Sequence, residues 1–223
     1  VHNVQNMVFT DCAAMDQLVF LAPSRVQEIN FQNCKLSDNA AAFIANRAPI
    51  ISNLVFNNCE GLVQPRLMNN NLKNLQFSDC AHLVKPFIVA PSLQQLTFKN
   101  CNSLQFQSLA NEVLVQQQQA PQGAAVPQMV MPRLNFLEFA NCSISQRVDM
   151  TVLTERLSIA NCNHLNSLHI SNAALAKMAV NSCAALSQVQ VNGSQMTEVL
   201  IRDCPALNSL VPQQVRSIMC AKC

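Results

Sequence analysis

Cysteine is the residue type in this sequence with the clearest capacity for chemistry. The 223 residues include 11 cysteines, and thiols can form disulfides, hold soft metals or act as nucleophiles. Zinc sites usually need two Cys-x2-Cys pairs, whereas this sequence has a single one, Cys220 and Cys223, at its end. We therefore interpret these two cysteines as a disulfide or as exposed thiols at an end contact, with a metal or redox role as the weaker alternative.

The other residue types common in active sites do not gather in the sequence. The four histidines are His2, His82, His164 and His169, and the 12 carboxylates are dispersed. No nucleophile elbow, zinc-protease motif, phosphate-binding loop or dinucleotide fingerprint occurs. We expect no catalytic residues, no cofactor and no metal, and we expect that the protein is not an enzyme.

The composition gives no charge-based preference for a partner. The formal net charge is +2 and 12% of the residues are charged, while Asn and Gln contribute 25 and 22 residues. This balance predicts no nucleic-acid binding. No apolar run reaches the 18 or so residues of a membrane span, so no membrane insertion is expected. The sequence starts at Val1 inside a repeat, so we expect that an upstream segment, either a signal peptide or part of a larger chain, has been removed.

Ten of the cysteines close one repeated phrase. It consists of three apolar residues at positions 1, 4 and 6 and Cys at position 9, as in LKNLQFSDC at residues 72–80. Consecutive copies lie about 21 residues apart, except for 41 residues between the fifth and the sixth. We expect 105–132 to be a divergent coil, with a strand near Glu112–Gln116, or a long loop. The copies end at Cys12, Cys34, Cys59, Cys80, Cys101, Cys142, Cys162, Cys183, Cys204 and Cys223.

Each phrase has the period of two that is expected of a β-strand. A strand that recurs about every 21 residues stacks in parallel on its successors, about 4.8 Å apart, if each coil closes on itself. Residues 1–223 are therefore predicted to form a single solenoid domain of ten or eleven coils, on the order of 50 Å long. In the C-terminal half, a second strand per coil is predicted at Leu168/Ile170, Val189/Val191 and Leu210.

Two further features of the interior are expected. Ser37 and Asp38 suit the start of a helical turn over Asn39–Arg47, with Phe43 and Ile44 facing inward. The repeat also predicts one stacked aromatic spine inside the solenoid, formed by Phe31, Phe56, Phe77, Phe98 and Phe139.

The phrase resembles the consensus of the leucine-rich repeat family, in which the cysteine position holds Asn or Cys, and the resemblance covers nearly the whole chain. It is similar to irregular, Cys-containing short repeats with a Leu three residues after the Cys. The resemblance implies a right-handed parallel β-solenoid of leucine-rich-repeat type, mainly β with short helical turns and about 10–11 coils. It also implies that the cysteine position hydrogen-bonds to the backbone of the loop. Scarce glycines and the lack of a Cys-rich flanking cap depart from the family pattern.

The ten repeat cysteines are interpreted as a structural ladder of buried thiols, because buried Cys behaves as a small apolar residue. Disulfides between neighbouring coils are the alternative, although stacked side chains point in parallel directions, which suits the bond poorly. The residue before each Cys is mostly Asn or Asp, which tolerate left-handed turns, so this column is expected to end each strand. A calcium-binding role is less favoured, since only three of these residues are Asp. The column reads Asp11, Asn33, Asn58, Asp79, Asn100, Asn141, Asn161, Ser182, Asp203 and Lys222.

The outward-facing strand column is the candidate binding face, because it has that role in leucine-rich repeats. It is mostly neutral and clusters neither aromatic nor charged residues. Asn141 and Asn192 begin two candidate glycosylation triplets. These triplets favour secretion slightly, whereas unpaired thiols favour a reducing compartment, and localisation stays open. The column reads Val8, Asn30, Val55, Gln76, Thr97, Glu138, Ser158, Ala179, Leu200 and Met219.

Two functional hypotheses follow. The first is a non-enzymatic structural or interaction protein that associates with itself or binds a protein or matrix partner. The alternative is a ligand-recognition module, like those of immune receptors or effectors, cut from a larger chain. Low charge, together with the absence of Tyr and Trp, favours the first, because recognition surfaces usually use aromatic anchors.

Overall fold

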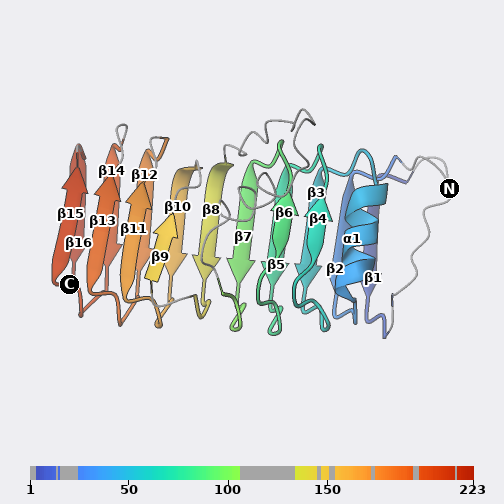
Figure 1. Cartoon of the computed structure of the whole chain (residues 1–223), viewed down its shortest axis with the longest axis horizontal. Coiled ribbons are helices and arrows are strands. Elements are labelled where there is room, and N and C mark those ends of the chain that lie inside the picture. Colours follow the sequence, from blue (N-terminus) through green and yellow to red (C-terminus); the bar gives the residue numbers. More distant parts are fainter. Residues whose placement is uncertain are drawn as a thin grey trace, which may run out of the picture.

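The chain folds into a parallel β-solenoid, in which one long sheet forms a wall along the whole molecule (Figure 1). The computed structural model describes residues 4–13, 15, 25–105, 134–144, 147–150, 154–171, 174–192, 196–213 and 215–223. The main sheet has ten strands, which coincide with the ten repeated phrases and confirm their prediction. They are β1 (Asn6–Thr10), β2 (Glu28–Gln32), β3 (Asn53–Asn57), β5 (Asn74–Ser78), β7 (Gln95–Lys99), β8 (Leu134–Ala140), β10 (Thr154–Ala160), β12 (Lys177–Asn181), β14 (Glu198–Arg202) and β16 (Ser217–Ala221).

The main sheet passes without interruption from β7 to β8. These strands pair directly, with Thr97 opposite Glu138, so no eleventh strand lies between them. Apart from Gln105, the segment 105–132 and the strand expected near Glu112–Gln116 lie outside the described residues. About eight coils with a period of about 21 residues are formed, against the ten or eleven expected.

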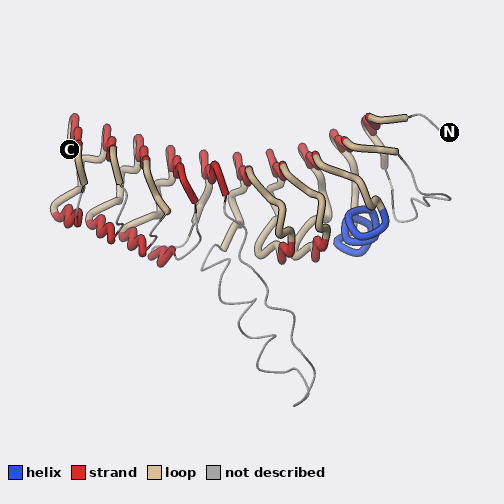
Figure 2. The backbone as a smooth tube through the Cα atoms, turned by 90° about the horizontal axis from the view of Figure 1, so that it is seen from above, coloured by secondary structure: helices blue, strands red, loops and turns tan. Residues whose placement is uncertain are grey.

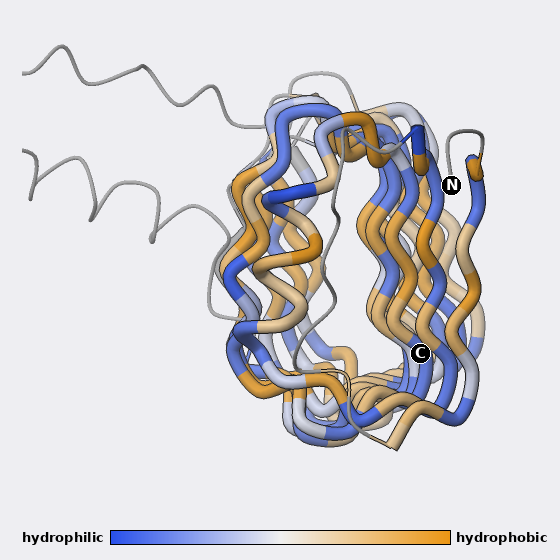
Figure 3. The backbone as a smooth tube through the Cα atoms, turned by 90° about the vertical axis from the view of Figure 1, so that its right-hand side faces the viewer, coloured by the Kyte–Doolittle hydropathy of each residue, from blue (hydrophilic) through white to orange (hydrophobic). Residues whose placement is uncertain are grey.

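A second layer is built from the return paths between the main strands. In the C-terminal half it is a four-stranded sheet of β9 (Arg147–Met150), β11 (Ser167–Ser171), β13 (Gln188–Asn192) and β15 (Ser209–Gln213), which confirms the three strands predicted there. The sequence did not indicate β9, nor the short pair β4 (Arg66–Met68) and β6 (Phe87–Val89). Figure 2 shows the main sheet on the concave side of a shallow arc, and Figure 3 shows the two walls end-on.

Helix α1 (Asp38–Arg47) occupies the second layer near the N-terminal end. The Ser37 hydroxyl accepts a hydrogen bond from the Ala40 N–H at 3.3 Å and caps the helix, as the sequence predicts. Ile44 is fully buried, but the expectation for Phe43 is wrong: its side chain is 40% exposed. The reason is that small residues next to Ile44, such as Ala41, fill the narrow inward stripe. The Arg47 guanidinium lies 5.5 Å from the centre of the Phe43 ring.

A buried amide joins the end of α1 to the next coil. The Asn69 side-chain nitrogen donates to the carbonyl oxygens of Ala45 and Ala48 at 2.7 and 3.0 Å. Its side-chain oxygen accepts from the backbone N–H groups of Asn71 and Leu72 at 2.8 and 3.0 Å. All strong hydrogen-bonding positions of this amide are thus used, as a buried polar group requires.

The interior between the layers is organised around stacked phenylalanines. The predicted spine is confirmed: its five members are fully buried, and consecutive rings stack with centroids 5.2–5.6 Å apart. Phe9, which is half-buried, extends the spine by one ring at 5.2 Å from Phe31. In the coils after Phe139, aliphatic residues take the place of Phe in the spine. They are Ile159, Val180 and Ile201, which are also fully buried. The same strand register thus aligns the core along the whole axis.

Replacing Phe77 with Ala is expected to lower the free energy of unfolding by about 3–5 kcal/mol, because it removes a buried ring between two stacked neighbours. Urea denaturation followed by circular dichroism measures this loss. Phe43→Ala is the matched control: its ring is 40% exposed, so a loss below about 1 kcal/mol is expected. Equal losses at the two positions would contradict the assigned core.

Candidate functional site

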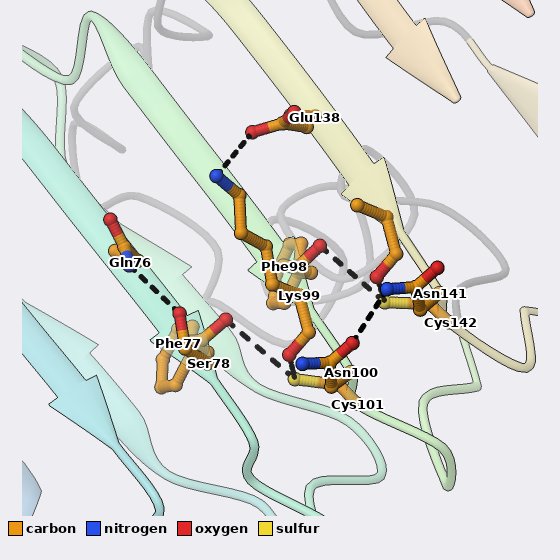
Figure 4. A network of polar contacts seen from close by, with 11 residues as sticks. Gln76, Phe77, Ser78, Phe98, Lys99, Asn100, Cys101, Glu138, Asn141 and Cys142 are labelled. Atoms are coloured by element: carbon orange, nitrogen blue, oxygen red, sulfur yellow. Dashed lines mark hydrogen bonds and ion pairs between the residues drawn. The ribbon is translucent and has the colours of Figure 1, made fainter. Parts of the chain in front are cut away.

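The ten repeat cysteines form a column of hydrogen-bonded thiols where the main strands end. Each thiol donates to the carbonyl of the residue two positions earlier, at 3.2–3.6 Å. Most also approach a carbonyl of the preceding strand; Cys101, for example, donates to Lys99 at 3.4 Å and to Phe77 at 3.7 Å (Figure 4). The acceptors therefore belong to strand ends rather than to the loop that the family resemblance implied.

The pKa shifts differ along the column. Burial and hydrogen bonds between thiols raise the pKa of five of these thiols, whereas a hydrogen bond with the preceding thiol lowers the pKa of Cys80, Cys142 and Cys204. Burial raises the pKa of Cys162 to about 12, and a hydrogen bond with the Cys142 thiol, together with burial, raises the pKa of Cys101. At Cys204 a hydrogen bond with the Cys183 thiol lowers the pKa to about 7, but this side chain is fully buried. All eleven cysteines are free thiols. The column therefore has the contacts of a structural element, and its inner thiols are out of reach of solvent.

The column before the cysteines turns the chain at the end of every main strand. All ten of its residues adopt left-handed backbone conformations, with φ between 48° and 55°, where Asn and Asp are tolerated better than other residues with a Cβ. Nine of their backbone N–H groups also donate to the last carbonyl of the following strand; Asn100 donates to Ala140 at 2.9 Å. The residue that turns the chain thus also makes the first backbone hydrogen bond to the next coil.

The side chains of this column form a second ladder that the sequence analysis missed. Each amide nitrogen donates to the side-chain oxygen of the preceding coil at 2.7–3.0 Å, in two runs that each end on an aspartate. The first runs from Asn58 through Asn33 to Asp11. The second runs from Asn161 through Asn141 and Asn100 to Asp79. The sequence does show amides at the same position of successive repeats. Which amide donates and which accepts can be determined only from the structure.

In the last two coils, an ion pair replaces the amide hydrogen bonds at the position before the cysteine. The Lys222 ammonium lies 3.4 Å from the Asp203 carboxylate, and the two side chains are 84% and 48% exposed. Exposed pairs of this kind contribute little to stability. The ladder column therefore begins with the carboxylate of Asp11 and ends with the ammonium of Lys222, so its two ends carry opposite charges.

Strand pairing places the ten residues of the candidate binding face in one outward column. Val8 and Met219, at the two ends, are 62% and 54% exposed, and the others are half-buried. Within the column, Glu138 pairs with Lys99 of the neighbouring strand at 3.3 Å (Figure 4). The face is therefore mostly polar at its centre and apolar at its ends.

The histidines lie apart from one another. His82 and His164 are exposed in loops, and His2 lies outside the described residues. His169, in β11, contacts the Arg147 guanidinium at 3.2 Å and the Ser167 hydroxyl at 3.4 Å. Among the described residues, no group of three His, Cys, Asp or Glu side chains could hold a metal ion.

The two glycosylation candidates differ in their surroundings. The Asn141 side-chain nitrogen, to which a glycan would attach, already donates to Asn100 at 2.8 Å, so a glycan there would compete with the ladder. Asn192 is half-buried at the end of β13, and its side-chain oxygen is buried without a hydrogen-bond partner. The remainder of its triplet, 193–194, lies outside the described residues.

The C-terminal edge of the main sheet exposes side chains that are buried in earlier coils. In β16, Ile218 occupies the inward position of Val199, yet it is 45% exposed whereas Val199 is fully buried. Cys220 is also exposed. The Cys223 thiol is exposed too, and it donates to the Ile201 and Ala221 carbonyls at 3.8 and 3.6 Å. This edge, together with β1, is the most accessible apolar part of the described main sheet.

The chain matches no known family model, no curated protein and no solved structure. Within the described part of the chain, no helix is long and apolar enough to cross a membrane.

Asn100→Ala is expected to destabilise the protein by about 1 kcal/mol more than Asn100→Gly, because Gly accepts the left-handed backbone while Ala is strained there. Both variants lose the two side-chain ladder bonds, so both should be less stable than the wild type. Urea denaturation measures the differences. Asn102→Ala, in an exposed turn, is the control and should change stability by less than about 0.5 kcal/mol. Equal losses for Ala and Gly would contradict the role of the backbone conformation.

In the native protein, a thiol reagent is expected to modify Cys220 and Cys223 rapidly, Cys12 more slowly, and the remaining cysteines only on unfolding. The reason is that reaction needs both access and thiolate, and the inner thiols are buried. Mass spectrometry of peptides from timed alkylation measures the order. Rapid labelling of Cys80 or Cys162 without unfolding would contradict it. Disulfides between neighbouring ladder positions would overturn the free-thiol assignment.

Proposed function

We propose that this protein is a non-enzymatic structural or interaction solenoid that associates with copies of itself. The observation that carries the proposal is the outward column of the main sheet, which is neutral and partly apolar, clusters neither aromatic nor charged residues, and keeps one register through the ten strands. A surface with little charge opposes contact between identical molecules only weakly.

The chemistry of the reactive side chains supports a role without catalysis. The ladder thiols serve as donors to strand carbonyls, and burial keeps thiols such as Cys162 protonated. A nucleophilic cysteine needs the opposite, an accessible thiolate. His82 and His164 lie in separate exposed loops.

We further infer that the repeat is of the leucine-rich-repeat type. The repeated phrase supports this, as does the arrangement of a parallel sheet on the concave side with variable return paths opposite (Figure 2). The return paths hold a helix in one coil and short strands in others, which is the kind of irregularity that the short repeats of this family tolerate.

A ligand-recognition module remains the alternative, and the charged side chains of the C-terminal half favour it. Beside the outward column, Arg156 and Lys177 lie opposite each other in neighbouring strands, and Lys177 pairs with Glu198 at 3.3 Å. Such a face could bind a protein partner of complementary charge. Charged residues make up only 12% of the chain, so self-association is the proposal we prefer.

The average mass of the purified protein is expected to rise with concentration in light scattering, under reducing conditions that exclude disulfide-linked species. Because the association is apolar, sulfate should strengthen it rather than disperse it. A strictly monomeric protein at the highest concentration reached would contradict self-association. Association that is lost in moderate salt would instead support a charged face as the contact.

A further inference from the structure

Exposed apolar side chains gather around α1 and β4, in the second layer of the solenoid. Of the eight large apolar side chains that are exposed in the described part of the chain, four lie in α1, in β4 and in the segments that flank them. Clusters of this kind mark interaction surfaces on soluble proteins. The four residues are Phe43, Ile50, Val63 and Met68.

We propose that these side chains form a docking surface for an acidic and apolar segment of a partner protein. The proposal goes beyond the self-association proposed above, because it concerns a different layer of the solenoid and a different partner. The surface is called the convex patch, and it consists of these four residues together with Arg47, Arg66, Phe87 and Val89.

Helix α1 lies beside β4 and runs in the same direction. At the start of the helix, the Asp38 carboxylate accepts hydrogen bonds from the backbone N–H groups of Val63 and Gln64 at 2.8 and 2.9 Å. At its end, the Asn46 side-chain oxygen accepts from the Met68 N–H at 3.0 Å. The helix and the strand therefore form one continuous surface opposite the main sheet (Figure 2).

Strand β6 extends this surface by one more coil. In β4, Leu67 is buried, so Arg66 and Met68 point outward, and both are exposed. Strand pairing places Phe87 opposite Arg66 and Val89 opposite Met68. Phe87 and Val89 are half-buried. The convex patch thus continues from α1 across two neighbouring strands.

Two guanidinium groups lie over aromatic rings of the patch. Arg47 is 5.5 Å from the centre of the Phe43 ring, and Arg66 is 5.0 Å from that of Phe87. Neither group makes an ion pair with a carboxylate among the described residues. The single carboxylate in α1, β4 and β6 is that of Asp38, and both its oxygens already accept backbone N–H groups. The patch is therefore apolar with an uncompensated positive charge.

An acidic and apolar peptide matches this combination. Apolar side chains supply the driving force for association when they leave water, and a guanidinium can bind a carboxylate through two parallel hydrogen bonds. Two copies of this chain joined patch to patch would instead bring Arg47 and Arg66 of both molecules together, and like charges across an interface are costly. The partner is therefore a different protein, whose binding segment carries carboxylates.

A hollow of about 530 Å³ lies at one end of the patch, a size within the range of pockets that hold small ligands. Its lining combines the apolar side chains of Met68 and Val89 with the amides of Asn46, Asn70 and Asn71. The Asn70 side chain is exposed and makes no hydrogen bond with the described residues. An amide offers a donor and an acceptor side by side, as an extended peptide backbone does. The hollow thus suits a large apolar side chain of a peptide and the backbone next to it.

An anionic membrane surface fits the convex patch less well. Segments that bind acidic lipids usually carry clusters of about four to eight Lys or Arg residues, whereas the patch has Arg47 and Arg66. The amides that line the hollow would also gain no specific partner from a lipid surface. A peptide uses both the cations and the amides, so it is the occupant that the patch favours.

Peptide selection tests the proposal. A displayed library of random dodecapeptides is selected on the full chain under reducing conditions. The enriched peptides are expected to combine Asp or Glu with large apolar residues. Fluorescence anisotropy of the labelled synthetic peptides then measures Kd for the wild type and for variants of the patch.

Met68→Lys is expected to weaken the binding of these peptides at least about tenfold, because it puts a charge into the apolar part of the patch. The Met68 side chain is 49% exposed, so the fold should tolerate the change. Arg47→Gln combined with Arg66→Gln is expected to weaken binding about fivefold in low salt, and this difference should shrink in high salt.

Two control variants locate the binding site. Gln188→Lys adds the same charge at an exposed position of β13, in the C-terminal half of the same layer, and should bind the peptides like the wild type. Arg156→Gln removes an exposed cation from the main sheet and should also bind them normally. Loss of binding in Arg156→Gln, with full binding in Met68→Lys, would place the site on the main sheet and overturn the inference.

Other outcomes would also overturn it. Enriched peptides that are basic or neutral, or that bind Met68→Lys as tightly as the wild type, would show that the convex patch does not select acidic segments. Binding to vesicles of phosphatidylcholine and phosphatidylserine that Met68→Lys abolishes, without any peptide binding, would make the patch a membrane contact.

Light scattering separates this inference from the proposed function. Met68→Lys is expected to self-associate like the wild type, because the outward column of the main sheet is unchanged. If the substitution abolished self-association, the occupant of the patch would be a second copy, and the inference would be wrong. A wild type that stays monomeric but binds the acidic peptides would contradict the proposed function and support the convex patch.

Discussion

The structure depends on one corner, the place where each main strand ends. A residue in the left-handed conformation turns the chain there, its N–H bonds to the next strand, and the thiol that follows turns inward to a strand carbonyl. Since the corner is the same in every coil, every strand leaves it in the same register. The stacking of the phenylalanines and the pairing of the outward column follow from this repetition, because parallel coils place equivalent residues on top of each other.

Stacking in register restricts which side chains the columns can hold. Like charges on neighbouring strands repel, whereas amides can donate to and accept from their own kind. Asn therefore holds half of the positions in the column at the corner, each amide run ends on the Asp that accepts its last bond, and the Lys222–Asp203 pair closes the column. The scarcity of charge in the whole chain, 12% of residues, agrees with this constraint, and the abundance of Asn has a structural reason.

An edge of such a sheet resembles the interface between two of its coils. Val199, at an inward position of β14, is completely buried. Ile218, at the equivalent position of β16, is 45% exposed. Any strand that continues the register can cover it.

The sequence by itself determined the ten main strands, the inward phenylalanines and the capped helix, because a strict period of about 21 residues fixes which positions coincide when coils stack. It also predicted left-handed corners from the Asn and Asp column. The short strands β4, β6 and β9 were not predictable, since three or four residues carry too little alternation. Tertiary structure decided that Phe43 faces outward, because small residues next to Ile44 fill the inward stripe of α1. It also decided the donor direction of the amide ladder, because an amide can both donate and accept, and only its neighbours in space select one arrangement.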